Sequence, residues 1–273
     1  MTAYISFRSG GTGRSLAHPV FLAGNGEANP VALRPMSRAE LAATVNGRDL
    51  LFGVHGFNVG FGDGVRQMAQ LERRLALPPP ASFFGILWPG DFFLPVVNYP
   101  FEAEDAVICG RRLAALCNGT FGGAASISFV AHSLGSRLVL EAAANLRRKA
   151  RTMCLAAAAV DRDALSRHYS AAVRNCETIS VLSSRRDMVL QVAYPVGDLV
   201  SDLLGDPDSP FGGALGYSGP HPPPGPTVRH RPIPNRFQCN HWHYLPQGRF
   251  WEPVAEFVRA GLTGSDAFWP PAS

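Results

Sequence analysis

The sequence contains a single lysine, Lys149, although it has 25 basic residues. A phosphate-binding loop of the G-x-x-x-x-G-K-[ST] type needs a lysine directly after its last glycine, and Lys149 follows an arginine, so this loop is absent. The segment 60–64 has the spacing G-x-G-x-G and not the G-x-G-x-x-G of a dinucleotide-binding loop. The net charge is only +4. We therefore expect neither a bound nucleotide nor a nucleic-acid partner.

Cysteines are few, and their spacing gives no pairing pattern. There are five, no two form a C-x-x-C motif, and most lie in apolar stretches, which favours buried free thiols over disulfides or a zinc site. The sequence also lacks an apolar stretch long enough to span a membrane, and its first residues lack the features of a signal peptide. We therefore expect a cytoplasmic protein without a membrane span.

Short apolar runs alternate with segments of helical periodicity, which is typical of a mostly parallel sheet covered by helices. With 273 residues, of which 46% are hydrophobic, we expect one domain over residues 1–273. The expected parallel strands are 50–55, 83–88, 127–131, 153–160 and 178–182. The expected helices are 63–75 with Asp63 as N-cap, 106–117, 134–146 and 251–262, and residues 4–7 and 19–22 are expected to form antiparallel edge strands.

One long segment departs from this alternation. Residues 205–236 are rich in proline and glycine, a composition that disfavours a helix or an inner strand. We expect a long loop there, within the domain, because the segment after it is predicted to complete the helical cover of the sheet. Loops of this length in compact domains are usually functional or mobile.

The segment most typical of a catalytic site is Ala131-His132-Ser133-Leu134-Gly135, which lies between a predicted strand and a predicted helix. Small residues stand two positions before and after Ser133, as in the G-x-S-x-G nucleophile elbow, with alanine in place of the first glycine. This sharp turn lifts a serine hydroxyl above the sheet, where a base can reach it. The backbone N–H of Leu134 is then a candidate donor to a developing oxyanion.

Three further segments accompany this turn: His55-Gly56-Phe57-Asn58, Trp88-Pro89 and Ser183-Ser184-Arg185-Arg186-Asp187. Together the four segments resemble a bacterial α/β-hydrolase family that is catalogued as a domain of unknown function. The resemblance extends from about Leu50 to His243. It implies the α/β-hydrolase fold, with a mostly parallel central sheet and helices on both faces, and a catalytic serine triad. Because the predicted elements follow one another closely, we expect no large cap domain.

The triad of this fold has the chain order serine, acid, histidine. Two acids after Ser133 follow predicted strands. Asp187 matches the family pattern and is favoured as the acid, and Asp161 is the alternative. Either carboxylate could instead cap a helix or form a surface ion pair with a neighbouring arginine.

The base is expected in the segment before the last helix, where His241 and His243 are the candidates. The resemblance favours His241, because it implies aromatic residues shortly after the catalytic histidine, and His243 is the alternative. A His-x-His metal site is a third interpretation, but no carboxylate cluster or H-E-x-x-H helix accompanies the pair.

In this fold the second oxyanion donor is a backbone N–H just after the His-Gly pair. This assigns the role to Phe57, with Asn58 as the alternative, and leaves His55 to orient the loop. Among the nearby aromatic residues, Trp88 and Trp242 are expected to line the substrate pocket.

These features predict a serine hydrolase that cleaves small-molecule carboxylic esters through an acyl-enzyme intermediate and needs no cofactor. The preference for esters rests on what the fold commonly hosts. One alternative is a lipase-like or cutinase-like esterase that acts at an interface, with residues 205–236 as a lid. The other is a non-catalytic α/β-hydrolase scaffold that serves as a binding module. The sequence carries no signal for the oligomeric state.

Overall fold

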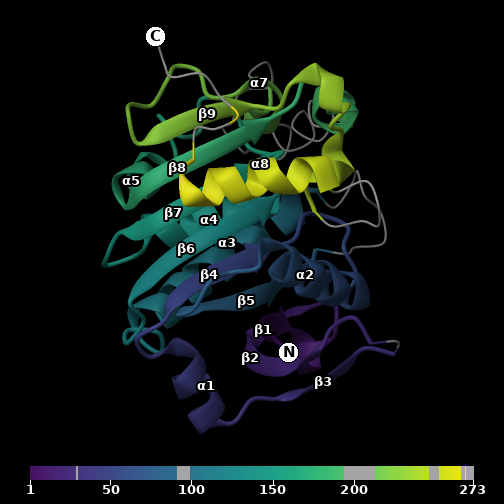
Figure 1. Ribbon diagram of the computed structural model, residues 1–273, viewed down its shortest axis with the longest axis vertical. Helices are drawn as coiled ribbons and strands as arrows, with labels where there is room; N and C mark the ends of the chain where they lie inside the picture. The colour runs from purple at the N-terminus through teal and green to yellow at the C-terminus, as the bar shows by residue number, and fades with distance from the viewer. Residues whose placement is uncertain (29, 91–98, 194–212, 246–251, 266–267, 269–273) are drawn as a thin grey trace.

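The computed structural model describes the chain except residues 29, 91–98, 194–212, 246–251, 266–267 and 269–273. Its centre is a nine-stranded sheet with the strand order β3-β2-β1-β5-β4-β6-β7-β8-β9 (Figure 1). The strands are β1 (Thr2–Arg8), β2 (Leu16–Asn25), β3 (Ala32–Pro35), β4 (Asp49–Val54), β5 (Ala81–Leu87), β6 (Ser126–His132), β7 (Ala150–Ala156), β8 (Cys176–Ser183) and β9 (Val228–Pro232). All neighbours from β1 to β9 in this order pair in parallel, and β2 and β3 are antiparallel.

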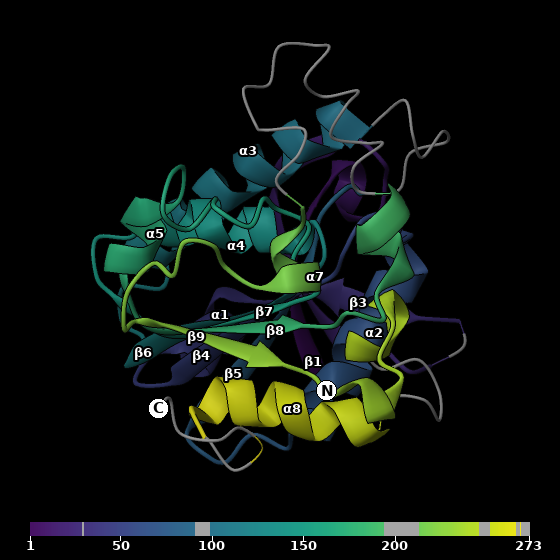
Figure 2. The same cartoon turned by 90° about the horizontal axis from the view of Figure 1, so that it is seen from above.

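Helices cover both faces of the sheet. Figure 2 shows α2 and α8 on one face and α3, α4 and α5 on the other. The helices of the described part are α1 (Arg38–Val45), α2 (Phe61–Leu75), α3 (Tyr99–Asn118), α4 (Gly135–Ala144), α5 (Ser170–Arg174), α7 (Leu215–Ser218) and α8 (Glu252–Thr263). Among them, none combines the length and the apolar character that crossing a bilayer requires.

The central strands are buried on both faces, which explains their unbroken apolar sequences. In the middle of the sheet, Phe52 of β4 stacks on Phe84 of β5 and on Phe129 of β6, with ring centroids 5.9 and 5.7 Å apart. All three rings are fully buried. The five cysteines are also buried, and all are free thiols, as expected. This core fixes the carboxyl ends of the parallel strands at one edge of the sheet.

The first strands differ in position from the prediction. β1 and β2 do pair antiparallel, but β1 lies inside the sheet between β2 and β5, and every residue of it is buried. The edge strand on this side of the sheet is β3, which the sequence did not predict. The start of α2 also differs, because its N-cap is Gly60. Asp63 lies in the first turn instead, where a negative charge interacts favourably with the helix dipole.

The proline-rich and glycine-rich segment is not a continuous loop. Its described part, residues 213–236, contains the short helix α7 and the strand β9, which pairs in parallel with β8. β9 is the last strand of the sheet and Pro232 is its final residue, a place where the missing N–H of proline is tolerated. The prediction of a loop is therefore wrong for α7 and β9. Residues 205–212 of this segment lie outside the described residues.

Candidate active site

Ser133 occupies a sharp turn between β6 and α4. Its φ is +52°, in the left-handed region that a residue with a side chain seldom adopts. Hydrogen bonds on both sides hold this conformation: the Ser133 N–H donates to the carbonyl of Ala156 at 3.0 Å, and its carbonyl accepts from the N–H of Ala159 at 3.2 Å. A Cβ at Gly135 would collide with the carbonyl oxygen of His55, so this position needs glycine. The turn has the geometry of a nucleophile elbow.

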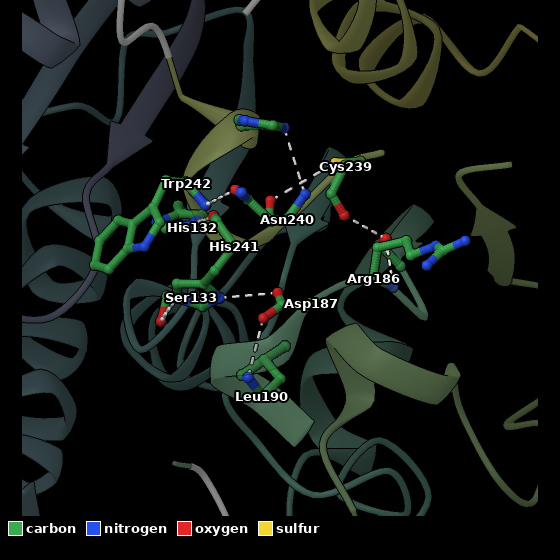
Figure 3. Close-up of polar contacts among 11 residues, drawn as sticks. His132, Ser133, Arg186, Asp187, Leu190, Cys239, Asn240, His241 and Trp242 are labelled. Carbon is green, nitrogen blue, oxygen red and sulfur yellow. Dashed lines mark hydrogen bonds and ion pairs between the residues drawn. The ribbon is translucent and has the colours of Figure 1, made fainter. Parts of the chain in front are cut away.

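The hydroxyl of Ser133 lies beside the imidazole of His241 (Figure 3). Ser133 Oγ is 3.0 Å from His241 Nε2, and His241 Nδ1 is 2.9 Å from Asp187 Oδ2. The other carboxylate oxygen of Asp187 accepts the backbone N–H of Leu190 at 2.9 Å. Serine, aspartate and histidine are 6%, 0% and 3% exposed. With a proton on Nδ1 facing the carboxylate, Nε2 can accept the proton of the hydroxyl.

Three distant segments supply these side chains. Ser133 directly follows β6, Asp187 lies in the turn after β8, and His241 begins the 3-10 turn η4 (His241–Tyr244) beyond β9. Because parallel strands end at the same edge of a sheet, the residues after β6 and β8 are brought to one place. The last strand then directs the histidine segment to the same edge.

The structure gives other contacts to the two alternative candidates, His243 as the base and Asp161 as the acid. His243 uses Nδ1 to accept the N–H of Asn240 at 3.4 Å, and the Asn240 side chain accepts the N–H of Trp242 at 3.1 Å, so that both side chains cap η4. Asp161 is buried and forms an isolated bridge with Ala214. The carboxylate that contacts His241 Nδ1 in the described residues is that of Asp187.

A metal site at the His-x-His segment does not fit this geometry. Both ring nitrogens of His241 are engaged, one by Ser133 and one by Asp187. Across the residues that the structure describes, no three histidine, cysteine, aspartate or glutamate side chains are grouped as metal ligands would be.

The loop after β4 lies directly against the nucleophile. A Cβ at Gly56 would be 2.9 Å from the Cβ of Ser133. The Nδ1–H of His55 donates to the carbonyl of Gly56 at 2.9 Å. Because a trans peptide points its C=O and N–H in opposite directions, this bond also fixes the direction of the Phe57 N–H.

The other candidate donors differ in availability. Leu134 caps α4, and its N–H has no hydrogen-bond acceptor among the residues described. The N–H of Asn58 donates to the carbonyl of Gly90 and is therefore engaged elsewhere. The assignment of the second oxyanion donor to Phe57 stays a prediction.

The two tryptophans expected at the substrate pocket lie in different environments. Trp88 is fully buried, stacks on His55 at a centroid distance of 5.7 Å, and donates its indole N–H to the His55 carbonyl at 2.9 Å. It supports the loop from within the core and does not line a pocket, so this prediction is corrected. Trp242 is 45% exposed and packs edge-on against His241 at 5.2 Å.

Two polar contacts were not anticipated from the sequence. His132 Nε2 lies 2.7 Å from the carbonyl oxygen of His241, and Ser184 Oγ donates to the carbonyl of Cys239 at 2.5 Å. Both residues stand inside segments that the resemblance had marked, which was the only available signal. Their partners are backbone carbonyls, which every residue carries, so the sequence does not indicate which of them is contacted.

The parallel sheet, the elbow and the chain of hydrogen bonds define an α/β-hydrolase. Comparison with known families agrees: residues 36–206, more than half of the chain, match the model of the family described as alpha/beta hydrolase of unknown function (DUF900). The protein belongs to this family. No curated protein matches the sequence.

Solved structures of similar architecture include several esterases. A carboxylesterase from Mesorhizobium loti is 20% identical with a TM-score of 0.45, and the match covers 90% of this chain and 94% of that one. An esterase from the archaeon Pyrobaculum calidifontis is 12% identical with a TM-score of 0.44, over 91% and 83% of the two chains. Esterase PE8 is 13% identical with a TM-score of 0.46, over 81% and 95%. Similarity at this level gives no information about the substrate.

Proposed function

We propose that this protein is a serine hydrolase that cleaves carboxylic esters through a Ser133-His241-Asp187 triad. The observation that carries the proposal is the continuous hydrogen-bonded chain from Ser133 Oγ through both nitrogens of His241 to the buried carboxylate of Asp187. A hydroxyl is a weak nucleophile unless an oriented base removes its proton. The three side chains have the relative arrangement that this activation requires.

The reaction has two halves. Ser133 Oγ attacks the carbonyl carbon of the ester while His241 Nε2 takes the hydroxyl proton, and the imidazolium then gives this proton to the leaving alcohol. Water, activated by the same nitrogen, attacks the acyl-enzyme and releases the acid. Asp187 holds the Nδ1–H tautomer and stabilises the transient imidazolium.

The negative charge of the tetrahedral intermediate needs two donors close to Ser133. We assign them to the backbone N–H groups of Leu134 and Phe57. The first stands at the N-terminus of α4, and the second is oriented by the bond between His55 and Gly56. One such donor contributes about 3 kcal/mol to transition-state stabilisation.

Exposed apolar side chains flank the site. Met188, next to Asp187, is 60% exposed, and Trp242, next to His241, is 45% exposed. Because Trp242 packs on the imidazole of His241 and keeps nearly half of its surface open, we assign it a contact with an apolar acyl or alcohol group of the substrate.

Labelling with a fluorophosphonate probe tests the nucleophile, because the probe reacts with activated serines. We expect mass spectrometry to locate the adduct on Ser133 and p-nitrophenyl esters to be hydrolysed. We expect Ser133→Ala to lower kcat about 10⁴-fold or more. Ser136→Ala is the matched control, since this buried hydroxyl one helical turn away has no hydrogen-bond partner in the described part of the chain.

The histidine assignment is tested in the same assay. His241→Ala is expected to reduce labelling and turnover to a small residual rate, whereas His243→Ala removes a cap of η4 and is expected to keep most of the activity. Absence of any adduct on Ser133 would favour a non-catalytic scaffold. A sharp rise in rate at the micellar threshold of the ester would favour an interfacial esterase.

A further inference from the structure

The segment that carries the catalytic histidine is held at two of its backbone carbonyls. We call residues 239–244 the histidine loop. Its first carbonyl, at Cys239, accepts the hydroxyl of Ser184 at 2.5 Å, and Ser184 belongs to the turn that leads to Asp187. The carbonyl of His241 itself is 2.7 Å from Nε2 of His132. The loop is therefore tied to the turn of the acid and to the elbow of the nucleophile.

His132 is well placed to fix a distance within the triad. It is the last residue of β6 and directly precedes Ser133, so its backbone has a fixed relation to the nucleophile. Its side chain is buried, with its ring centroid 4.8 Å from that of His241 and 6.2 Å from that of Tyr244. The imidazole therefore packs against the ring of the residue whose carbonyl it contacts.

The hydrogen-bond acceptor shows which ring nitrogen of His132 carries a hydrogen. A carbonyl oxygen can only accept, so His132 Nε2 must carry the hydrogen. Burial, and next the nearby His241, lower the pKa of His132 to about 3, so the ring is neutral at ordinary pH. A neutral donor suits this place, because His241 becomes positively charged when it takes the serine proton and a second cation beside it would oppose the transfer.

We propose that His132 is a positioning residue that keeps the His241 imidazole within hydrogen-bonding distance of Ser133 by anchoring the His241 carbonyl. The proposal rests on the hydrolase function proposed above. Ser184 plays the same part at the start of the histidine loop, through the carbonyl of Cys239. Without the anchor at residue 132, His241 is still supported by Ser184 through Cys239, by the Asn240 cap, by the Asp187 carboxylate and by the packing of Trp242. These allow the ring to shift relative to the hydroxyl.

The test compares two variants that both remove the imidazole. His132→Gln keeps an N–H donor that reaches the same carbonyl, and His132→Met has a similar size without a donor. We expect His132→Met to lower kcat and the rate of fluorophosphonate labelling between about 10-fold and 100-fold, with KM unchanged, since displacement of about 1 Å costs that much. His132→Gln is expected to recover most of the rate at a similar melting temperature.

A double-mutant cycle separates positioning from other roles. If His132 acts through His241, replacing His132 by Met in a His241→Ala background changes the residual labelling rate by less than about twofold. A persisting effect would show that residue 132 acts elsewhere. Equal rates for His132→Met and the wild type, or equal losses for the Met and Gln variants, would also overturn the proposal.

A readout that does not need turnover keeps the two proposals distinguishable. The proton between His241 Nδ1 and Asp187 is expected to give a strongly downfield proton resonance. This signal should be lost or shifted in His132→Met and retained in His132→Gln. If the wild type fails to hydrolyse esters, the resonance still decides whether His132 positions His241. If His132→Met does not fold, the test uses Ser184→Ala, which removes the second anchor. This variant must also lower the rate of labelling, and an unchanged rate would overturn the proposal.

Discussion

The carboxylate of Asp187 lies 2.9 Å from Nδ1 of His241 in a place where neither side chain is open to solvent. A buried carboxylate is costly unless its lone pairs are satisfied. Here Oδ2 faces the imidazole and Oδ1 accepts the N–H of Leu190. The aspartate is thus fixed by the protein, and the imidazole is oriented by the aspartate.

The first prediction concerns this pair. Asp187→Asn should keep the shape of the site but favour the wrong imidazole tautomer, because an amide N–H facing Nδ1 forces the proton onto Nε2. We expect kcat to fall by up to about 10⁴-fold with little change in KM. Steady-state kinetics with a p-nitrophenyl ester measure this. Asp161→Asn serves as the control, and a comparable loss there would support Asp161 as the acid.

The second prediction concerns the loop after β4, which carries the proposed oxyanion donor Phe57. Gly56→Ala places a methyl group 2.9 Å from Ser133 Cβ and from His132 Nδ1, closer than real Cβ contacts, so the loop or the elbow must move. We expect at least about a 10²-fold loss in kcat, the usual cost of displacing an oxyanion donor. Gly62→Ala is the control in the same region, because its nearest contact would be an ordinary 3.6 Å. Similar kinetics of the two variants would contradict this prediction.

The third prediction separates the two tryptophans. Trp88→Ala leaves a cavity in the core and removes a hydrogen bond to His55, and we expect it to lower the free energy of unfolding by about 3–5 kcal/mol. The side chain of Trp242 is about half exposed. Trp242→Ala should therefore change the free energy of unfolding by less than about 0.5 kcal/mol, whereas KM for long-chain esters should rise. Urea unfolding and kinetics over a series of acyl lengths check both. An unchanged KM in Trp242→Ala would remove this residue from the substrate contact.

The fourth prediction concerns acid stability. Burial lowers the pKa of both His55 and His132 from 6.5 to about 3. At pH values between about 3 and 6.5, these two histidines are protonated in the unfolded chain but neutral in the native state. The free energy of unfolding therefore falls as the pH drops from about 6.5 toward 3. Above 6.5 the contribution of both residues is fully present. Each can contribute a slope of about 1.4 kcal/mol per pH unit.

His132→Gln removes one of these groups and isolates its share of the slope. Urea unfolding at several pH values between about 5 and 7 should show a shallower pH dependence for the variant than for the wild type. Carboxylates titrate in both proteins, so their contribution cancels in the difference. Parallel curves would mean that His132 is protonated similarly in the folded and unfolded chains.

The parts of the fold that were predicted are those that local sequence encodes. The unbroken apolar run of β4 predicts a strand buried on both faces, and the structure confirms it. The proline-rich and glycine-rich composition around β9 predicts a loop. This was wrong because a short edge strand needs hydrogen bonds on one side only, and β8 supplies them. Composition does not report the availability of a neighbouring strand.

The candidate site likewise combines features that local sequence encodes with features that depend on distant segments. The small residues around Ser133 mark a tight turn, since steric fit within five neighbouring positions depends on nothing distant. Local sterics could not decide which of the two imidazoles, two positions apart, faces the serine. They also could not decide how the surroundings of the two indoles differ. Both outcomes depend on which atoms meet when segments 108 positions apart converge at the ends of parallel strands. Local sterics therefore determined the elbow, whereas long-range packing decided which imidazole faces the serine hydroxyl.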